Sequence, residues 1–307
     1  MHLLIPFAAS PSAGARDALA QLPLPQLTRL LRQLTQVRAD TGMPASRSPP
    51  HERALAHALG LPLVDGMIPW AAWQHQSDAV CAWISLCHWQ ARVGRITLSD
   101  PQSLQVTSAE SSTLLDAMQP YFAEDGITLS EHSPGLWLAQ GEPLRGLACT
   151  ALDRVIGRRI EDWMPEGPTA PLAHRLQNEM QMLLYTHPVN DARTEQGLLP
   201  INSFWLHGAG AVPADFRAPA LDAPLMPLTL REAAVREDWA AWGQAWQALD
   251  GGPVAQALAL AEQGQPVTLT LCGESNALRF ERLPRSLLQR LTQHFSQTSM
   301  SNLLSQL

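Results

Sequence analysis

Apolar residues recur at helical spacing in the middle of the chain and predict a long amphipathic helix. The stripe consists of Leu172, Leu176, Met180, Leu183 and Leu184. Residues at these intervals share one helix face. Thr169 suits the N-cap and Pro171 suits the first turn, where a missing N–H is an orphan in any case. Pro188 predicts the end of the helix, because the residue before a proline avoids the helical conformation. A polar loop is expected to follow.

The other segments alternate between helical periodicity and short apolar runs, which is typical of an α/β protein. Strands are expected at residues 3–7, 82–92, 95–98, 127–129, 136–138, 201–206, 267–272 and 278–283. Helices are expected at residues 19–34, with a break near Pro23 and Pro25, and at 51–59, 107–122, 229–249, 254–263 and 285–295. Trp239, Trp242 and Trp246 follow one helix face, and we interpret them as core residues.

The chain has 307 residues, which is enough for one large domain or two ordinary ones. A proline-rich stretch at residues 165–171 indicates a linker. We therefore expect residues 1–98 and 171–307 to form an α/β core, and residues 99–170 to form an inserted α+β subdomain.

Charge and cysteine content narrow the classes of function. The net charge is −7, and all 21 basic residues are arginines that form no basic block. Nucleic-acid binding is not expected, since it requires clustered positive charge. The four cysteines are scattered without a CxxC pair, which predicts reduced, buried thiols and a cytoplasmic location. No apolar run is long enough to cross a bilayer, so no membrane partner is expected.

The polar residues after the central helix are the candidate ligand-binding site. They are His187, Asn190, Arg193, Asn202, Gly208 and Gly210. The planar fork of Arg193 suits a phosphate or carboxylate, and the glycine turn could present backbone N–H groups to an anion. His187 falls at the C-terminal end of the helix. The structural alternative is that Asn190 caps the next turn, that Arg193 pairs with Glu179 or Glu195, and that the glycines only permit the turn.

The sequence contains no familiar catalytic or metal-binding motif. We find no HExxH pair, no GxSxG elbow and no phosphate-binding P-loop, and the ten histidines lack metal-ligand spacing. We therefore expect no cofactor, no metal and no confident catalytic residue. If the chain is an enzyme, His187 is the candidate acid/base or phosphate acceptor. A third hypothesis is a protein-interaction module that uses Trp70, Trp73 and Trp89.

The run HPVNDARTEQGLLPIN at residues 187–202, followed by Trp205 and Gly208-x-Gly210, resembles the archaeal-type cofactor-independent phosphoglycerate mutases. The resemblance implies a degenerate alkaline-phosphatase-like core with an inserted substrate-type domain. Enzymes of that family use two metal ions held by Asp and His, and their first strand ends in Asp-Gly. Here the first strand ends in Ile5-Pro6-Phe7-Ala8, and His294 is the one histidine after Ala211. Mutase activity by the family mechanism is therefore not expected, because the metals supply its main charge clamp.

Over nearly its full length the chain also resembles the RpfE-type bacterial regulatory proteins. The runs SPPHERALA, PYFAEDGITL, NEMQMLLYTHPVNDAR and LPINSFWLHGAGA carry this similarity. It implies a cytoplasmic regulator with no defined reaction. The leading hypothesis is therefore a non-catalytic regulatory or binding protein on a phosphoglycerate-mutase-like scaffold, with an anionic small molecule or a protein as its partner. The alternative is a mutase-like phosphomutase or phosphatase.

Overall fold

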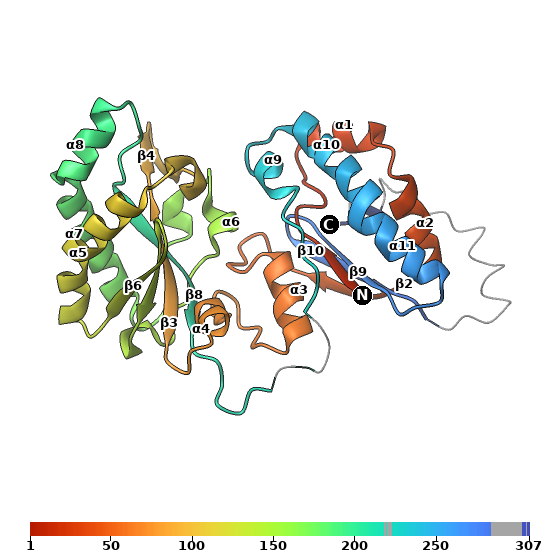
Figure 1. The fold of residues 1–307 in the computed structure, drawn as a ribbon, viewed down its shortest axis with the longest axis horizontal. Coiled ribbons are helices and arrows are strands. Elements are labelled where there is room, and N and C mark those ends of the chain that lie inside the picture. Colours follow the sequence, from red (N-terminus) through yellow and green to blue (C-terminus); the bar gives the residue numbers. More distant parts are fainter. Residues whose placement is uncertain (218, 220–222, 284–302, 305) are drawn as a thin grey trace. The chain divides into compact units, whose positions relative to one another are not determined.

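A computed structural model describes residues 1–217, 219, 223–283, 303–304 and 306–307. The chain forms two compact units (Figure 1). Unit 1 comprises Met1–Leu59 and Ala218–Leu307, and unit 2 comprises Gly60–Arg217. The expected mixture of helices and strands is confirmed. No helix in the described ranges is long and apolar enough to span a membrane.

Unit 1 contains a four-stranded mixed sheet of order β1-β9-β10-β2. Its strands are β1 (His2–Ile5), β2 (Thr35–Thr41), β9 (Thr268–Cys272) and β10 (Asn276–Glu281). β1 and β9 run parallel, whereas β10 pairs antiparallel with both β9 and β2. The first and last parts of the described chain thus share one sheet.

Helices pack against this sheet around a core that includes the buried indoles of Trp242 and Trp246. They are α1 (Ala13–Gln21), α2 (Pro25–Gln33), α9 (Arg231–Val235), α10 (Trp239–Leu249) and α11 (Ala255–Glu262), with a π-helical turn at Asp250–Val254. Helix α3 (Pro50–Leu59) packs instead against a smaller apolar cluster of Leu4, Cys272 and Ala277. The predicted break near Pro23 and Pro25 and the core role of the tryptophan stripe are confirmed. The predicted helix at residues 285–295 lies outside the described residues.

Unit 2 is built on an antiparallel sheet of order β6-β7-β3-β8. Its strands are β3 (Cys81–Cys87), β6 (Thr128–Ser133), β7 (Leu136–Gln140) and β8 (Ser203–Gly210), and a separate hairpin consists of β4 (Trp89–Arg92) and β5 (Arg95–Leu98). The helices are α4 (Trp70–His75), α5 (Ser108–Glu124), α6 (Leu152–Val155), α7 (Ala170–Tyr185) and α8 (Pro188–Glu195). The expected strand at 82–92 is therefore two strands, which His88 separates.

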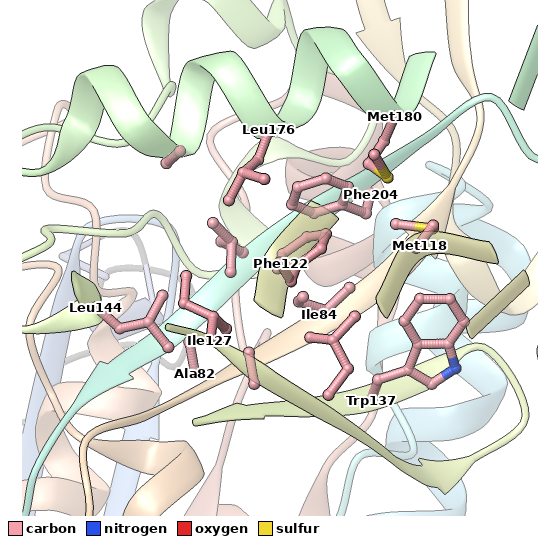
Figure 2. Close-up of a cluster of buried hydrophobic side chains, with 14 of the residues drawn as sticks. Ala82, Ile84, Met118, Phe122, Ile127, Trp137, Leu144, Leu176, Met180 and Phe204 are labelled. Carbon is pink, nitrogen blue, oxygen red and sulfur yellow. The ribbon is translucent and has the colours of Figure 1, made fainter. Parts of the chain in front are cut away.

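The core of unit 2 lies between its sheet and the helices α5 and α7 (Figure 2). Leu176 and Met180 project from α7 toward Phe122, Phe204 and the strands, and all four side chains are 1% exposed or less. The predicted α7 stripe is confirmed, since Leu176, Met180 and Leu184 are buried and its other two leucines pack at the edge. The opposite sheet face carries smaller apolar clusters beside α4 and α6.

The domain boundaries differ from those expected. We predicted that residues 60–98 and 171–217 belong with the termini, but they form unit 2 together with residues 99–170. The reason is strand pairing: β3 lies between β7 and β8, so three segments that are distant in sequence share one sheet. The expected linker also differs, since Ala170 already begins α7.

Candidate functional site

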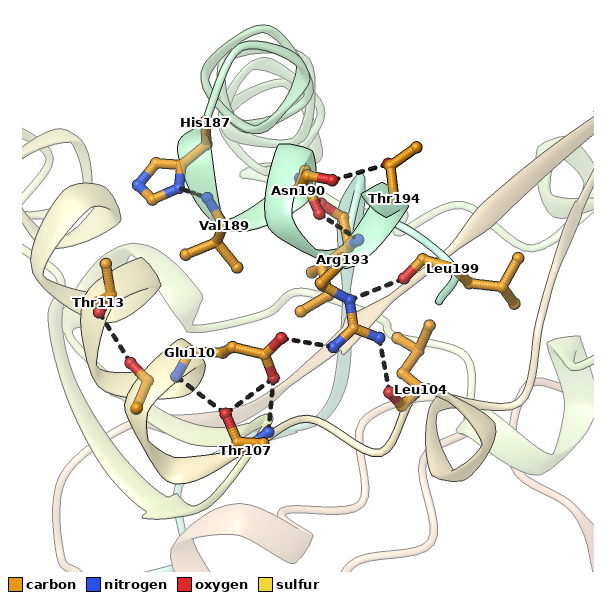
Figure 3. Close-up of polar contacts among 12 residues, drawn as sticks. Leu104, Thr107, Glu110, Thr113, His187, Val189, Asn190, Arg193, Thr194 and Leu199 are labelled. Atoms are coloured by element: carbon orange, nitrogen blue, oxygen red, sulfur yellow. Dashed lines mark hydrogen bonds and ion pairs between the residues drawn. The ribbon is translucent and has the colours of Figure 1, made fainter. Parts of the chain in front are cut away.

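The polar loop expected after α7 is a helix, α8, and His187 is its N-cap residue. Pro188 occupies the first helical position, where its missing N–H is harmless and its fixed φ is favourable. The Nδ1 atom of His187 accepts a hydrogen bond from the Val189 N–H at 3.2 Å (Figure 3). The ring therefore faces the start of α8, although its backbone follows the end of α7.

Asn190 joins the end of α7 to the segment that leads into β8. Its amide nitrogen donates to the carbonyl oxygens of Leu184 at 2.8 Å and Ile201 at 2.7 Å. Its side-chain oxygen accepts from the Ile201 N–H at 2.7 Å. The side chain is buried inside unit 2 and is hydrogen-bonded at both ends. Asn190 thus fixes the position of a strand entrance, and the turn-capping role in the structural alternative belongs to His187 instead.

Arg193 is the most enclosed charged residue among those described, with a side chain that is 1% exposed. Its guanidinium donates to the carbonyl oxygens of Leu199 at 2.8 Å and Leu104 at 2.6 Å. Its third bond runs to the Glu110 carboxylate at 2.9 Å (Figure 3). The expected partners Glu179 and Glu195 were wrong. The fork instead joins three segments of unit 2.

Glu110 serves Arg193 and the start of α5 at the same time. Its carboxylate accepts from the backbone N–H of Thr107, whose hydroxyl accepts from the Glu110 N–H, which makes a capping box. Partial burial pushes the pKa of Glu110 upward, but hydrogen bonds from Thr107 and Arg193 outweigh burial and hold this pKa below its ordinary value. The ion pair is therefore built into the helix terminus.

Asn202 connects the start of β8 to the start of β4. Its side-chain oxygen accepts from the Trp89 N–H at 2.7 Å, and its amide donates to the Trp89 carbonyl at 2.9 Å. The Asn202 amide thus bonds to both backbone groups of Trp89, as a paired residue on a neighbouring strand would. Asn190, Arg193 and Asn202 thus make internal hydrogen bonds, and ligand binding by them stays a prediction.

The expected turn at Gly208 and Gly210 is wrong, because β8 continues through both residues and Gly210 pairs with Cys81. Both have positive φ, +62° and +141°. A Cβ on Gly208 would lie 2.9 Å from the Cβ of Trp70. The glycines allow the residues at the start of α4 to approach the strand closely. The backbone of both glycines therefore belongs to strand β8 and does not form a turn.

Two features of unit 2 were not predicted, and the first is a polar pair. Ser85 on β3 and His207 on β8 form a cross-strand hydrogen bond of 2.9 Å between Oγ and Nε2. Burial lowers the pKa of His207 from 6.5 to about 4, and nearby Asp153 opposes this effect weakly. Strand alternation could have placed Ser85 and Trp83 on the same face of β3. It could not have identified His207 on β8 as the partner of Ser85, because these two residues are 122 positions apart. No local motif reports such a contact.

The second unpredicted feature is a cavity of about 490 Å³ beside the end of α4. Trp73 and Asp78 line it together with Phe216. The sequence singled out Trp73 only as part of a tryptophan surface with Trp70 and Trp89. Trp70 is 6% exposed and the other two are partly buried, so these three residues form no exposed cluster.

The end of β1 in unit 1 is filled by aromatic contacts. Phe7 has a φ of +56°, and its ring centroid lies 5.3 Å from that of His51. The Phe7 carbonyl accepts from the indole N–H of Trp242 at 3.0 Å.

All four cysteines are buried free thiols, as expected. Among the residues that the structure describes, no group of three or more His, Cys, Asp or Glu side chains has an arrangement that could hold a metal ion.

No protein-family model matches the chain. A 125-residue segment is 30% identical to the 2,3-bisphosphoglycerate-independent phosphoglycerate mutase of Methanosarcina barkeri, covering 39% of this chain and 30% of that protein. A 70-residue segment is 36% identical to the corresponding protein of Methanothrix thermoacetophila, covering 23% and 18%. A probable mutase of Geobacter sulfurreducens is 27% identical over 124 residues, covering 39% and 30%.

The chain is similar, over part of its length, to cofactor-independent phosphoglycerate mutases. The similarity spans less than a third of each of these relatives. Among solved structures, the cofactor-independent phosphoglycerate mutase of Thermoplasma acidophilum aligns with a TM-score of 0.36 at 14% identity, over 91% of this chain and 89% of that one. A protein of Pyrococcus horikoshii aligns with a TM-score of 0.40 at 10% identity, over 92% and 87%. The resemblance to RpfE-type proteins stays a prediction.

Proposed function

We propose that the chain is a non-catalytic binding protein with a regulatory role, built on a phosphoglycerate-mutase-like scaffold. The observation that carries the proposal is the position of Arg193. Its three hydrogen bonds connect Glu110, Leu104 and Leu199 inside unit 2. An arginine fork that clamps a transferring phosphoryl group must face the ligand, whereas this fork stabilises the fold.

The end of β1 supports the same proposal. The resemblance to the mutases implies an Asp-Gly at the end of the first strand, but the chain has Ile5-Pro6-Phe7-Ala8 there, and the Phe7 ring contacts His51. Phosphoryl transfer by the two-metal route depends on metal ions that bridge and neutralise the reacting phosphate. A chain that keeps the neighbouring scaffold and replaces these groups is suited to binding without turnover. The RpfE-type resemblance adds the regulatory role.

The ligand class that we propose is a small phosphorylated or carboxylated molecule, and His187 is the group of the 187–210 stretch best placed to meet it. Its side chain is partly exposed, and only Nδ1 is hydrogen-bonded to a described residue. The Nε2 atom therefore remains to donate to an anion. The adjacent N-terminus of α8 adds a helix dipole that favours an anion.

A thermal-shift titration of metal-stripped protein with 3-phosphoglycerate, with and without Mn²⁺, tests this proposal alongside a turnover assay. We expect no turnover and a metal-independent rise in Tm through linkage of binding to folding. The rise should vanish in His187→Ala and persist in His75→Ala, which removes an exposed histidine elsewhere. Turnover by the wild type, or a rise that requires Mn²⁺, would overturn the proposal.

The second candidate is a mutase-like phosphomutase or phosphatase, and the partial sequence similarity to curated mutases favours it. His187 would then act as the acid/base or the phosphate acceptor. This reading requires turnover of phosphoglycerate, or of a phosphate monoester, that His187→Ala abolishes and His75→Ala retains. Equal, negligible rates in all three proteins would refute it.

A further inference from the structure

The cavity beside α4 is a second place where unit 2 can receive a small molecule. Its volume of about 490 Å³ falls within the range of ordinary ligand sites. The residues that determine its chemistry are Trp73, Gln74, Gln76, Ser77, Asp78 and Phe216. They come from the end of α4, from the residues directly after it and from the segment after β8. All belong to unit 2, so the cavity is defined within one compact body.

Two aromatic rings, together with Ala72 and Val212, supply the apolar part of the lining. Trp73 and Phe216 are both partly buried, so each presents some ring surface to solvent. The Trp73 ring is held in place by an edge-on contact with Trp70, with centroids 5.8 Å apart and planes at 79°. Trp70 itself is 6% exposed and anchored in unit 2. A positioned indole face attracts cations, which makes this lining suitable for one.

The charge of the lining also favours a cationic ligand. Asp78 is the charged residue among those that line the cavity. It is solvent-exposed, and no described residue donates a hydrogen bond to its side chain or forms an ion pair with it. A carboxylate without a protein partner is available to a cationic ligand and repels an anionic one. This lining therefore differs from the anion site expected around residues 187–210.

The amide and hydroxyl groups add a requirement for an oxygen atom on the ligand. The Gln74 Oε1 atom accepts from the indole N–H of Trp83 at 2.7 Å, so the Gln74 NH₂ group remains to donate. The Ser77 Oγ atom accepts from the Ala79 N–H at 3.1 Å and the Gln140 amide at 3.3 Å. The Ser77 proton is likewise left to donate, so the lining offers donors beside its cation-binding groups.

We infer that this cavity binds a small organic cation that carries a hydroxyl or carbonyl oxygen, of the amino-alcohol class. The cation lies against Trp73 and Phe216 near Asp78, and the oxygen accepts from Gln74 or Ser77. The inference is independent of whether the chain binds or turns over phosphate esters.

Isothermal titration calorimetry with choline, and with its uncharged isostere 3,3-dimethylbutan-1-ol, tests the inference on the full chain. The two probes share shape and hydroxyl group and differ in charge. We expect saturable binding of choline, with the uncharged alcohol at least about tenfold weaker. Trp73→Leu should weaken choline about tenfold and Asp78→Asn about threefold.

The matched control is Asp215→Asn, which removes an exposed carboxylate near the cavity that is not part of its lining. Its choline affinity should equal that of the wild type. If Trp73→Leu fails to fold by circular dichroism, Phe216→Leu replaces it as the test of the aromatic lining. Absence of saturable choline binding, or equal affinity for the alcohol with no effect of Asp78→Asn, would overturn the inference.

Discussion

Arg193 illustrates how a buried charge can be integrated into a fold. Removing its side chain takes one donor from each of three acceptors and leaves the Glu110 carboxylate without its cationic partner. We expect Arg193→Ala to lower the free energy of unfolding by about 3–5 kcal/mol, since the remaining charge is left without its partner. Urea denaturation followed by circular dichroism measures this loss.

Arg175 provides the matched control for that variant. It pairs with Asp125 at 2.6 Å, which is a shorter contact than that of Arg193 with Glu110, but its side chain is 50% exposed. Surface pairs contribute little, so Arg175→Ala should lower the free energy of unfolding far less than Arg193→Ala does. Equal costs for the two variants would show that burial does not decide the energetics of the Arg193 contacts.

His207 predicts an acid-sensitive component of stability. Its pKa is 6.5 in an ordinary environment and about 4 in the folded chain, where burial disfavours the charged ring. Between these values the unfolded chain binds a proton that the folded chain does not. The contribution is therefore intact above pH 6.5 and is lost as the pH falls toward 4, by up to about 3 kcal/mol.

Urea unfolding at several pH values between 7 and 4.5 tests this prediction against His207→Gln. Glutamine keeps a partner for the Ser85 hydroxyl and does not titrate. The stability of the variant should fall less steeply with acid than that of the wild type. Burial also lowers the pKa of His2 to about 4, so the wild type and the variant both keep the part of the pH dependence of stability that His2 causes. If the free energies of unfolding of the two proteins fell in parallel with acid, His207 would not be the source of the acid-sensitive component.

At the scale of elements, β8 owes its close contact with the start of α4 to Gly208. A Cβ at this position would meet Trp70 at 2.9 Å, and φ is +62°. Gly94, in the turn between β4 and β5, has a similar φ of +73° with open space around it. Gly94→Ala should therefore cost about 1 kcal/mol from backbone strain alone.

Gly208→Ala adds a steric clash to the same strain, so we expect a cost about 1–3 kcal/mol larger than that of Gly94→Ala. Comparing the urea midpoints and m-values of the two variants isolates the contact between β8 and α4. Equal costs would indicate that α4 moves away from the strand easily.

Periodicity predicted most elements, because an apolar stripe is a local property of the sequence. The leucine stripe of α7 was recognisable for this reason. Pro188 was misread because a proline is compatible with both the end of one helix and the first position of the next. The sequence placed Asn190, Arg193 and Asn202 in one polar stretch. It could not report that Arg193 meets Glu110, which lies 83 positions away.

At the scale of the molecule, the domain boundaries were missed because strand pairing is non-local. β3, β7 and β8 come from three distant parts of the chain and become neighbours only in the folded sheet. The linker signal at residues 165–171 marks a loop inside unit 2. The cavity beside α4 was missed for a related reason, since its lining joins residues 72–78 to residues 212 and 216.

Unit 2 is continuous in sequence, which leads to a prediction about autonomous folding. The main core cluster of this unit lies wholly between Val80 and Ala211, and two smaller apolar clusters among the described residues also lie within residues 60–217. A fragment of residues 60–217 therefore carries the contacts of these three clusters. We expect it to unfold in urea in a single cooperative transition, with coincident circular dichroism and tryptophan fluorescence.

Two variants of the fragment determine whether this transition reports the native core. Trp137 is 0% exposed and its indole N–H donates to Ser111, so Trp137→Ala should cost about 3–5 kcal/mol and remove most of the transition. Met182 lies on α7 but is 75% exposed, so Met182→Ala should leave the midpoint nearly unchanged. A broad transition that neither variant alters would mean that the fragment collapses without its native packing. Unit 2 would then depend on the rest of the chain, even though its core residues are all present.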